Sequence, residues 1–428
     1  MKERMAIIEG VRSPIAKAGG KFKNLQAETL GARVVQEAVL RSGLCYSDYD
    51  EVIIGNVSQP THAANVARVI SLKAGFSDET IAYTVHRNCA SGMESITSAT
   101  EKILAGSGKV YLCGGVESMS NVPLLFGTQM KHFLEALSRS RTLTQKLQTI
   151  QHFRPGYLKP VIGLMQGLRD PVSGLMMGST AEILAQDFGI SREEQDSFAL
   201  ESHQKASRAQ QKGIFAEEIV PIVYDISHAK IMHDDDGIRH EQSLEALGKL
   251  HPFFDRKNGT VTAANSSQIS DAAAALTLMS ESEAKKRGLE PLGFLSGFAY
   301  AGLEPKRMGM GPYYATAKLF KEMKILLKDI DLIEMNEAFS VQVQANLKAF
   351  PSKHYAAAHG FNAPLGEINT NVLNVNGGAV ALGHPVGMTG TRLVIHVLKE
   401  LRRRKKERGL ATLCIGGGQG AALLLEVV

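Results

Sequence analysis

The chain has 428 residues, of which 44% are hydrophobic, and its formal net charge is +5. This length excludes a single small domain and allows a large core to be buried. The modest charge does not predict a nucleic-acid partner. No apolar run could span a bilayer, and residues 1–8 lack the apolar segment of a signal peptide, so we expect a cytoplasmic protein. Four cysteines without a CxxC pair fit a reducing compartment and disfavour a zinc site.

The first 120 residues alternate between segments with the pattern of strands and segments with the pattern of helices. Strands are predicted at residues 7–8, 50–57, 81–85 and 110–113, and helices at residues 27–42 and 63–74. Another helix is predicted after Cys89, ending near Gly106. Alternation of this kind favours a mixed sheet that is covered by helices on both faces.

Cys89 lies among small residues at the predicted turn between a strand and a helix. Free backbone N–H groups at a helix N-terminus favour negative charge, so we expect this position to lower the pKa of the thiol. A thiolate here would be a nucleophile, and Ala90, Ser91 and Gly92 would let a substrate carbonyl approach it. The alternative is a buried cysteine that packs as a small hydrophobic residue.

Residues 121–174 are rich in basic side chains and carry two apolar stripes at helical spacing. Met130, Phe133, Leu134 and Leu137 form the first stripe, and residues 143, 147 and 150 form the second. The pattern predicts two basic amphipathic helices that bind an anionic membrane surface or a partner subunit. The alternative is a helical pair that packs on its own domain and exposes only its basic face.

The region up to residue 279 gives weaker signals. Residues 180–212 are predicted to be helical, with a capping box at Ser191, and residues 224–250 to be irregular. Asp234 to Gly237 lack the rest of a calcium loop, so we expect a polar turn. The hydroxyl residues within 258–267 precede an alanine-rich segment, 271–279, that is predicted to be a helix. They suit a phosphate or pantetheine contact, and simple helix capping explains them equally well.

The C-terminal part carries three further motifs. They are the Asn336-Glu337-Ala338-Phe339 sequence, the run 374–385 with His384 between glycine and proline, and the run 413–420 with Cys414 before a glycine turn. Residues 50–56 and 113–115 are echoed weakly by residues 331–336 and 414–418. Two similar α/β halves would bring the helix starts near Cys89 and His384 together.

A nucleophilic cysteine, an imidazole base and oriented backbone donors are the parts needed for acyl transfer through a thioester. A second thiol, Cys414, could carry the proton at the carbon next to a thioester. Spacing alone also allows purely structural roles for these residues. Cys414 could belong to a strand core, His384 could be a capping or core residue, and Asn336 could be a turn residue.

Five ordered motifs together resemble the thiolase superfamily over nearly the whole chain: residues 88–92, 114–120, 336–339, 376–385 and 414–420. The resemblance implies an α/β fold of two similar βαβαβαββ halves, each with a five-stranded sheet, stacked in five αβαβα layers. The N-terminal half would span residues 1–120 and 271–289, and the C-terminal half residues 290–428. A loop domain, 121–270, would lie between them and carry the basic insertion at about 123–169.

The resemblance also implies roles for single residues. Cys89 would take the acyl group, and His384 would activate it and, with a water held by Asn336, stabilise one oxyanion. The backbone N–H groups of Cys89 and Gly416 would form a second oxyanion hole, and Cys414 would move the α-carbon proton. Coenzyme A contacts carried over from the family are Ser267, Met308, Ala338 and Phe339. No metal or redox cofactor is implied, because the coenzyme A thioesters are substrates.

Two features favour the degradative, 3-ketoacyl-CoA-cleaving members of the family. Met176 stands where short-chain biosynthetic members have histidine, and the basic insertion resembles the membrane-associating hairpin in β-subunits of the fatty-acid β-oxidation trifunctional complex. The implied reaction gives acetyl-CoA and a shortened acyl-CoA. The implied partners are a second copy in a homodimer or tetramer, a hydratase/dehydrogenase α-subunit, and the inner-membrane surface as a peripheral contact.

Three alternatives remain open from the sequence. The first is a short-chain acetoacetyl-CoA thiolase with the same catalytic residues. The second is a condensing enzyme that depends on acyl-carrier protein, which Cys414 disfavours because those relatives usually carry histidine or asparagine there. The third is a non-catalytic scaffold that binds membranes.

Overall fold

The computed structural model describes residues 3–427, so Met1, Lys2 and Val428, the outer ends of the two predicted halves, lie outside it. The main sheet of the described chain has ten strands in the order β12-β13-β14-β11-β1-β10-β5-β3-β4, with β2 paired to β10. The two halves share this sheet because β1 pairs antiparallel with β11 over residues 5–7 and 293–295.

The N-terminal half supplies five longer strands, the two-residue strand β2, and the helices that cover them. Strands β3, β4 and β5 run parallel, whereas β10 is antiparallel to both β5 and β1. The predicted helix at residues 27–42 and the predicted strand at 81–85 are confirmed with the same bounds. The elements are β1 (Met5–Arg12), β2 (Ala16–Lys17), α1 (Ala27–Ser42), β3 (Glu51–Gly55), α2 (Val66–Ala74), β4 (Ile81–Val85), α3 (Ser91–Leu104), β5 (Val110–Ser118), β10 (Ser270–Ser280) and α10 (Glu281–Arg287).

The C-terminal half has a similar arrangement built from four strands. Strands β12 and β13 are parallel and β14 is antiparallel to β13 and β11, but the position of a fifth strand is reduced to one bridge between Ile333 and Leu373. The elements are β11 (Gly293–Gly302), α11 (Gly311–Met323), β12 (Leu332–Met335), α12 (Ser340–Ala349), α13 (Lys353–Ala358), α14 (Ala379–Leu382), α15 (Val386–Arg404), β13 (Arg408–Ile415) and β14 (Gln419–Glu426).

Three hydrophobic cores separate five layers. One core joins α1 and α2 to the N-terminal strands, and another joins α11 and α12 to the C-terminal strands. The third lies between the halves, where apolar side chains of α3 and α15 pack against both sets of strands. This order of layers is the predicted αβαβα fold, and it places the start of α3 and the start of α15 in the middle of the molecule.

The alanine-rich segment is a strand rather than the predicted helix. Residues 270–280 form β10, and all eleven are buried between β1 and β5. The high helix propensity of alanine is a weak preference that tertiary contacts override. Small side chains here allow α1 and α15 to approach the sheet from its opposite faces.

The loop domain is more regular than the sequence predicted. The predicted helical region 180–212 is two helices, α7 (Met177–Phe188) and α8 (Arg192–Gln211), because Gly189 ends the first in a left-handed conformation and Ser191 caps the second. The segment expected to be irregular contains a hairpin of β8 (Ile222–Asp225) and β9 (Lys230–Met232) and the short α9 (Leu244–Gly248).

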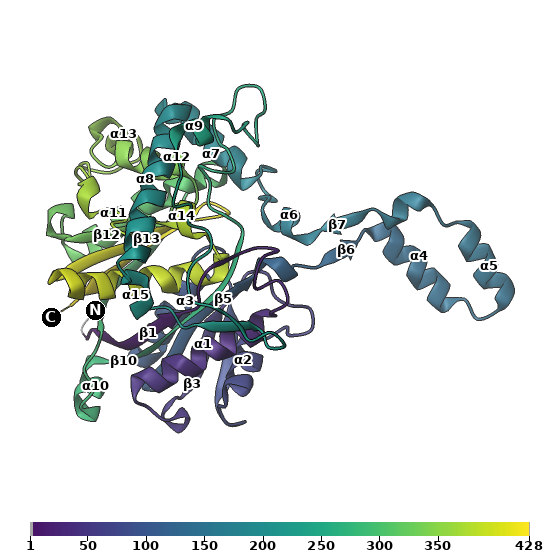
Figure 1. Cartoon of the computed structure of the whole chain (residues 1–428), viewed down its shortest axis with the longest axis horizontal. Coiled ribbons are helices and arrows are strands. Elements are labelled where there is room, and N and C mark those ends of the chain that lie inside the picture. Colours follow the sequence, from purple (N-terminus) through teal and green to yellow (C-terminus); the bar gives the residue numbers. More distant parts are fainter. Residues whose placement is uncertain (1–2, 428) are drawn as a thin grey trace.

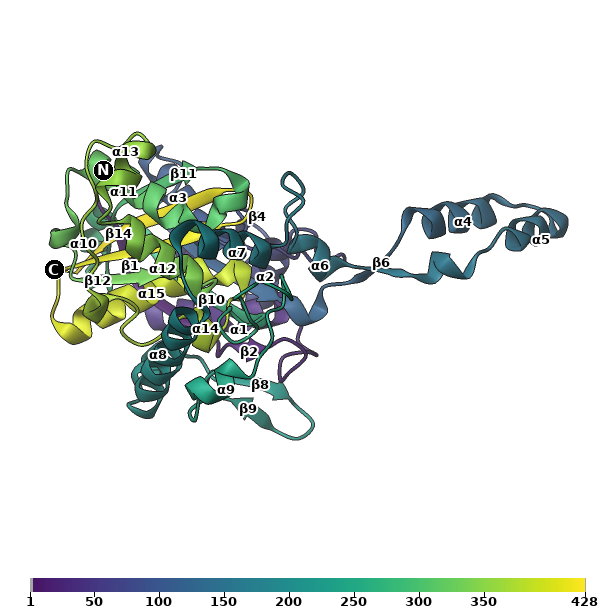
Figure 2. The same cartoon turned by 90° about the horizontal axis from the view of Figure 1, so that it is seen from above.

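The basic insertion projects far from the body of the molecule (Figures 1 and 2). We call residues 123–169 the arm. The predicted amphipathic helices are present, so this part of the prediction is confirmed. The alternative that they pack on their own domain is wrong, because both views place α4 and α5 at the far end of a narrow ribbon. The arm consists of β6 (Leu124–Phe126), α4 (Thr128–Arg139), α5 (Leu143–Gln151), β7 (Pro160–Ile162) and α6 (Gly163–Gly167).

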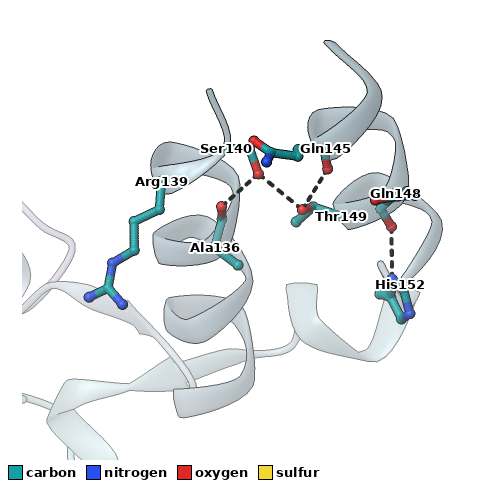
Figure 3. Close-up of a pocket in the computed structure, with 7 residues that line it drawn as sticks. All are labelled: Ala136, Arg139, Ser140, Gln145, Gln148, Thr149 and His152. Atoms are coloured by element: carbon teal, nitrogen blue, oxygen red, sulfur yellow. Dashed lines mark hydrogen bonds between the residues drawn. The ribbon is translucent and has the colours of Figure 1, made fainter. Parts of the chain in front are cut away.

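Between the two arm helices lies an open, shallow hollow of about 340 Å³. Figure 3 shows its polar lining, where Ser140 lies 3.2 Å from Thr149 across the gap and Arg139 extends away from it. Phe133, Phe153 and Tyr157 form a small aromatic cluster that holds the arm together. Among residues 3–427, no helix is both long enough and apolar enough to cross a membrane.

Candidate active site

Cys89 lies in a tight turn between β4 and α3. The hydroxyl of Ser91 fixes this turn: it donates to the carbonyl of Asn88 (2.7 Å) and accepts from the backbone N–H of Arg87 (2.9 Å). Asn88 has a φ of +45°, in the left-handed region that asparagine tolerates better than most residues. The turn therefore presents the partly exposed Cys89 side chain immediately before the first turn of α3.

The expected lowering of the Cys89 pKa is wrong. Burial raises the pKa of the thiol, and the backbone N–H groups of Gly416 and of Cys89 itself oppose this rise only in part. The prediction considered the helix end alone and could not include desolvation by the folded chain around the thiol. The thiol is therefore protonated near neutral pH, and it needs a base to become a nucleophile.

Cys414 and Gly416 lie at the turned end of the β13–β14 hairpin. Cys414 is fully buried, and burial holds its pKa well above the usual value for a thiol, with a smaller contribution from the charge that Cys89 carries when it is ionised. The Nδ2 of Asn88, the residue before Cys89, donates to the carbonyl of Gly416 at 2.7 Å, so the turn that carries Cys89 and the loop that follows Cys414 meet at one point. Residues 325 positions apart in the chain thus share one site.

His384 lies between α14 and α15 with its imidazole buried. Its Nδ1 atom is 2.6 Å from the hydroxyl of Thr389, and this hydroxyl donates to the carbonyl of Pro385. The hydroxyl must therefore accept from Nδ1–H, which leaves Nε2 as the unprotonated nitrogen. Within the described chain Nε2 has no protein partner, so it can accept a proton from a substrate or a thiol. No motif in the sequence pointed to Thr389 as a partner of His384.

The pKa of His384 is lowered to about 4, mainly by burial and secondly by the charge of Arg392. The ordinary value is 6.5, so the neutral form that accepts protons persists to lower pH than in a solvated histidine. We expect the acylation rate of Cys89 to be lost only as the pH falls through about 4. Rapid-quench measurement of acylation across the acid range tests this, and an acid limb centred near 6.5 would contradict it.

Asn336 follows β12 and is completely buried. Neither of its amide atoms has a hydrogen-bond partner within residues 3–427, as would suit an amide that serves a water or a ligand. The neighbouring Glu337 is used differently. Its carboxylate accepts from Ser202 (2.7 Å), Asn374 (2.8 Å) and the backbone N–H of Val380 (3.2 Å), and so holds the loop that leads to His384.

A cavity of about 480 Å³ opens beside His384. Two of the predicted coenzyme A contacts, Ser267 and Phe339, line it, whereas Met308 and Ala338 are buried and are not among the lining residues. The backbone N–H of Ser267 donates to the carbonyl of Ala338, which fixes the wall at that place. A Cβ atom on Gly416 would lie 3.2 Å from the sulfur of Met177, another lining residue, so the cavity borders the Gly416 loop.

Several lining residues escaped the sequence analysis because they come from separate loops. Met165 and Leu168, from α6 and the residue just after it, form part of the wall at the root of the arm. Arg239 also lines the cavity, and its side chain is exposed, which suits a guanidinium that meets an anionic group of a ligand. Its only signal in the sequence is its place after the polar turn at residues 234–237.

Comparison with known proteins agrees with this arrangement. Residues 5–282 match the family described as thiolase, N-terminal domain, and residues 289–427 match thiolase, C-terminal domain. Proteins named 3-ketoacyl-CoA thiolase from Yersinia enterocolitica and Pectobacterium carotovorum are each 40% identical over 427 residues, covering 99% of this chain and 97% of the relative.

Solved structures resemble the chain over its full length. The Bacillus anthracis acetyl-CoA acetyltransferase has a TM-score of 0.88 at 39% identity, covering 100% of this chain and 99% of that chain. Human mitochondrial 3-ketoacyl-CoA thiolase in complex with CoA has a TM-score of 0.85 at 34% identity, covering 100% and 98%. The motifs, the five layers and these matches agree, and the chain belongs to the thiolase family.

Proposed function

We propose that this chain is a 3-ketoacyl-CoA thiolase, an acyltransferase that cleaves a 3-ketoacyl-CoA with CoA into acetyl-CoA and an acyl-CoA shorter by one acetyl unit. The observation that carries the proposal is the meeting of the two halves at one site, where Asn88, the residue before Cys89, donates from its Nδ2 to the carbonyl of Gly416, two residues after Cys414, at 2.7 Å. His384 lines the adjoining cavity. The names and the full-length match of the bacterial relatives support the same reaction.

The first step uses the neutral imidazole of His384. Its Nε2 takes the proton of the Cys89 thiol, and the thiolate attacks the 3-keto carbon of the substrate. The bond between carbons 2 and 3 then breaks, which leaves the acyl group on Cys89 and an enolate of acetyl-CoA. The Cys414 thiol gives its proton to this enolate, a role that its strongly raised pKa suits because the thiol stays protonated until a strong base forms.

The second step transfers the acyl group to CoA. The Cys414 thiolate takes the proton of the CoA thiol, the CoA sulfur attacks the thioester on Cys89, and the expelled Cys89 sulfur takes back the proton that His384 holds. Backbone N–H groups of Cys89 and Gly416 would hold one oxyanion, and His384 with a water on Asn336 would hold the other. Oriented donors of this kind are each worth about 10²- to 10³-fold in rate. No metal or redox cofactor is needed for these steps.

The cavity supports substrates with an acyl chain. Most of its lining is apolar, and the sulfurs and rings of Met119, Met165, Met176 and Phe253 contribute to it. We expect faster turnover of 3-ketohexadecanoyl-CoA than of acetoacetyl-CoA when the two are compared at equal concentrations. A clear preference for acetoacetyl-CoA would instead support a short-chain acetyl-CoA C-acetyltransferase, the second candidate, which the name of the Bacillus anthracis structure favours.

The arm supports contact with an anionic membrane surface. Its second helix, α5, has no buried residue, and Leu143, Leu147 and Ile150 are 77%, 54% and 51% exposed. An isolated nine-residue helix is marginal in water, so its apolar stripe needs a cover outside the chain. The exposed cations of the arm beside this stripe favour acidic phospholipids.

Reversing the charge of Arg139, Arg141 and Lys146 to glutamate should weaken binding to vesicles of acidic phospholipid at least about 10²-fold, since each cation contributes about 1 kcal/mol near such a surface. Binding of the unaltered chain should fall steeply between low and physiological salt. Cosedimentation with vesicles measures both effects.

A matched variant reverses three exposed lysines outside the arm, Lys21, Lys286 and Lys328, and should bind as the unaltered chain does. Equal loss in both variants would indicate a general charge effect. Binding that is unchanged in the arm variant would point to a partner protein as the cover of α5.

Self-association is supported by the free edge of the main sheet. Strand β4 ends the sheet, and Ile81 on it is 60% exposed, as an edge that pairs with a second copy would be. We infer a homodimer or a dimer of dimers, which sedimentation equilibrium would detect, and a monomer at all concentrations would contradict it. A hydratase/dehydrogenase α-subunit and a cytoplasmic location with peripheral membrane contact stay predictions.

A further inference from the structure

The loop that carries Gly416 is a three-residue turn, 416–418, that is closed by the pairing of Ile415 with Gln419. Gly417 and Gly418 follow it with φ values of +90° and +82°, and three successive glycines leave the backbone unusually free to move. On its outer side the loop is held by the backbone, because Leu303 donates its N–H to the carbonyl of Gly418 at 2.8 Å. On the side of the active site no backbone strand accompanies it.

Asn88 supplies the restraint on that side. Its Nδ2 donates to the carbonyl of Gly416 at 2.7 Å, across a sequence separation of 328 residues. A carbonyl oxygen can only accept, so the amide nitrogen must be the atom that faces it. Among residues 3–427 this is the one side-chain hydrogen bond to a backbone carbonyl of residues 415–418.

The backbone of Asn88 is shaped for this contact. The φ of +45° directs the side chain toward the opposite half, and the carbonyl of Asn88 is at the same time held by Ser91. The residue thus joins the Cys89 turn of one half to the Gly416 loop of the other. The proposed function has two oxyanion donors, the N–H groups of Cys89 and Gly416. The hydrogen bond of Asn88 links the two backbone segments that carry them.

We propose that Asn88 is a positioning residue that holds the Gly416 N–H in register with the Cys89 N–H through its bond to the Gly416 carbonyl. The inference rests on the proposed function, because it assigns a purpose to Asn88 only if an oxyanion forms beside Cys89. Without the bond the glycine loop samples other positions, and the second donor is absent from the site for part of the time.

The positive φ of Asn88 allows the amide to be removed without straining the backbone. Asn88→Gly keeps this conformation available and deletes the hydrogen bond, whereas Asn88→Ala deletes the bond and also strains the turn. Asn88→Asp keeps the shape of the side chain but directs an acceptor at the carbonyl of Gly416. Comparing the three separates the hydrogen bond from the backbone and from the size of the side chain.

The primary measurement is the rate at which acetyl-CoA acylates Cys89, followed by rapid quench and mass spectrometry. We expect Asn88→Gly to slow acylation about 10- to 100-fold, less than or equal to the effect of losing one oxyanion donor. Asn88→Asp should slow it at least as much. Asn88→Ala should match Asn88→Gly in rate and unfold at a lower temperature.

The second measurement is alkylation of Cys89 by iodoacetamide as a function of pH, a reaction in which no oxyanion forms. In Asn88→Gly the pH profile of the alkylation rate should move to higher pH, because the Gly416 N–H no longer stabilises the Cys89 thiolate. Asn121→Ala removes a similar bond, from an asparagine amide to the carbonyl of Leu25 at 3.0 Å, and should change neither measurement.

The inference is overturned if Asn88→Gly acylates at the normal rate. It is also overturned if the acylation rate falls while the pH profile of alkylation stays in place. A third contrary outcome is that the acylation rate and the alkylation profile change only together with a lower unfolding temperature, since Asn88 would then be only structural. If the unaltered chain forms no acetyl adduct on Cys89, the proposed function fails first, and that outcome is seen before any variant is made.

Discussion

Replacing Cys89 with serine should lower thiolytic activity by a factor on the order of 10⁴ or more, because nucleophile and base act as one unit. A neutral hydroxyl gives up its proton far less readily than a thiol, and His384, with a pKa of about 4, is too weak a base to compensate. The measurement is the steady-state rate with a 3-ketoacyl-CoA, together with mass spectrometry of the intact chain after incubation with acetyl-CoA.

The matched control is Cys45→Ser. Cys45 is the exposed cysteine at the start of a short helical turn, remote from the site in sequence and in the fold, and its replacement should leave the rate unchanged. An acyl adduct that persists in Cys89→Ser, or one found on another residue of the unaltered chain, would contradict the assignment of the nucleophile.

Replacing Cys414 with alanine should separate the two halves of the reaction. Acylation of Cys89 by acetyl-CoA needs no proton at the α-carbon, so it should continue at nearly the normal rate. Cleavage of 3-ketoacyl-CoA and exchange of the acetyl-CoA methyl protons with deuterated water both need that proton, and should fall about 10²- to 10⁴-fold.

Cys113→Ala is the control for a lost thiol in the core, since Cys113 is also a fully buried cysteine on a central strand. Its replacement should lower the unfolding temperature without separating acylation from proton exchange. Equal loss of acylation and exchange in Cys414→Ala would mean that Cys414 acts only through packing.

The elements that the sequence predicted best are those in which local pattern and tertiary environment agree. Helix α1 has an amphipathic repeat and ends at Gly43 in a left-handed conformation, so its bounds follow from local rules. Strand β10 is the opposite case. Its alanines favour a helix when considered alone, but its place between β1 and β5 leaves only an extended backbone able to complete both ladders.

In the arm, too, one feature followed from local sequence and another did not. The spacing of apolar and basic residues was sufficient to predict α4 and α5, because it depends only on the helical repeat. These helices stand away from the body because the paired strands β6 and β7 carry them outward. No local sequence pattern describes the direction in which such a ribbon leaves a domain.

The sequence by itself determined the chemistry that is available: two cysteines, a histidine and an asparagine, each in a motif at the end of a strand or at the start of a helix, and a weak duplication that implied two halves. Only the tertiary structure decided how these groups behave. Burial raised the pKa of Cys89, where the helix end alone predicted a fall, and burial together with the charge of Arg392 lowered that of His384. The physical reason is that desolvation and charge depend on which groups surround a side chain in space, and a local sequence pattern does not show those groups.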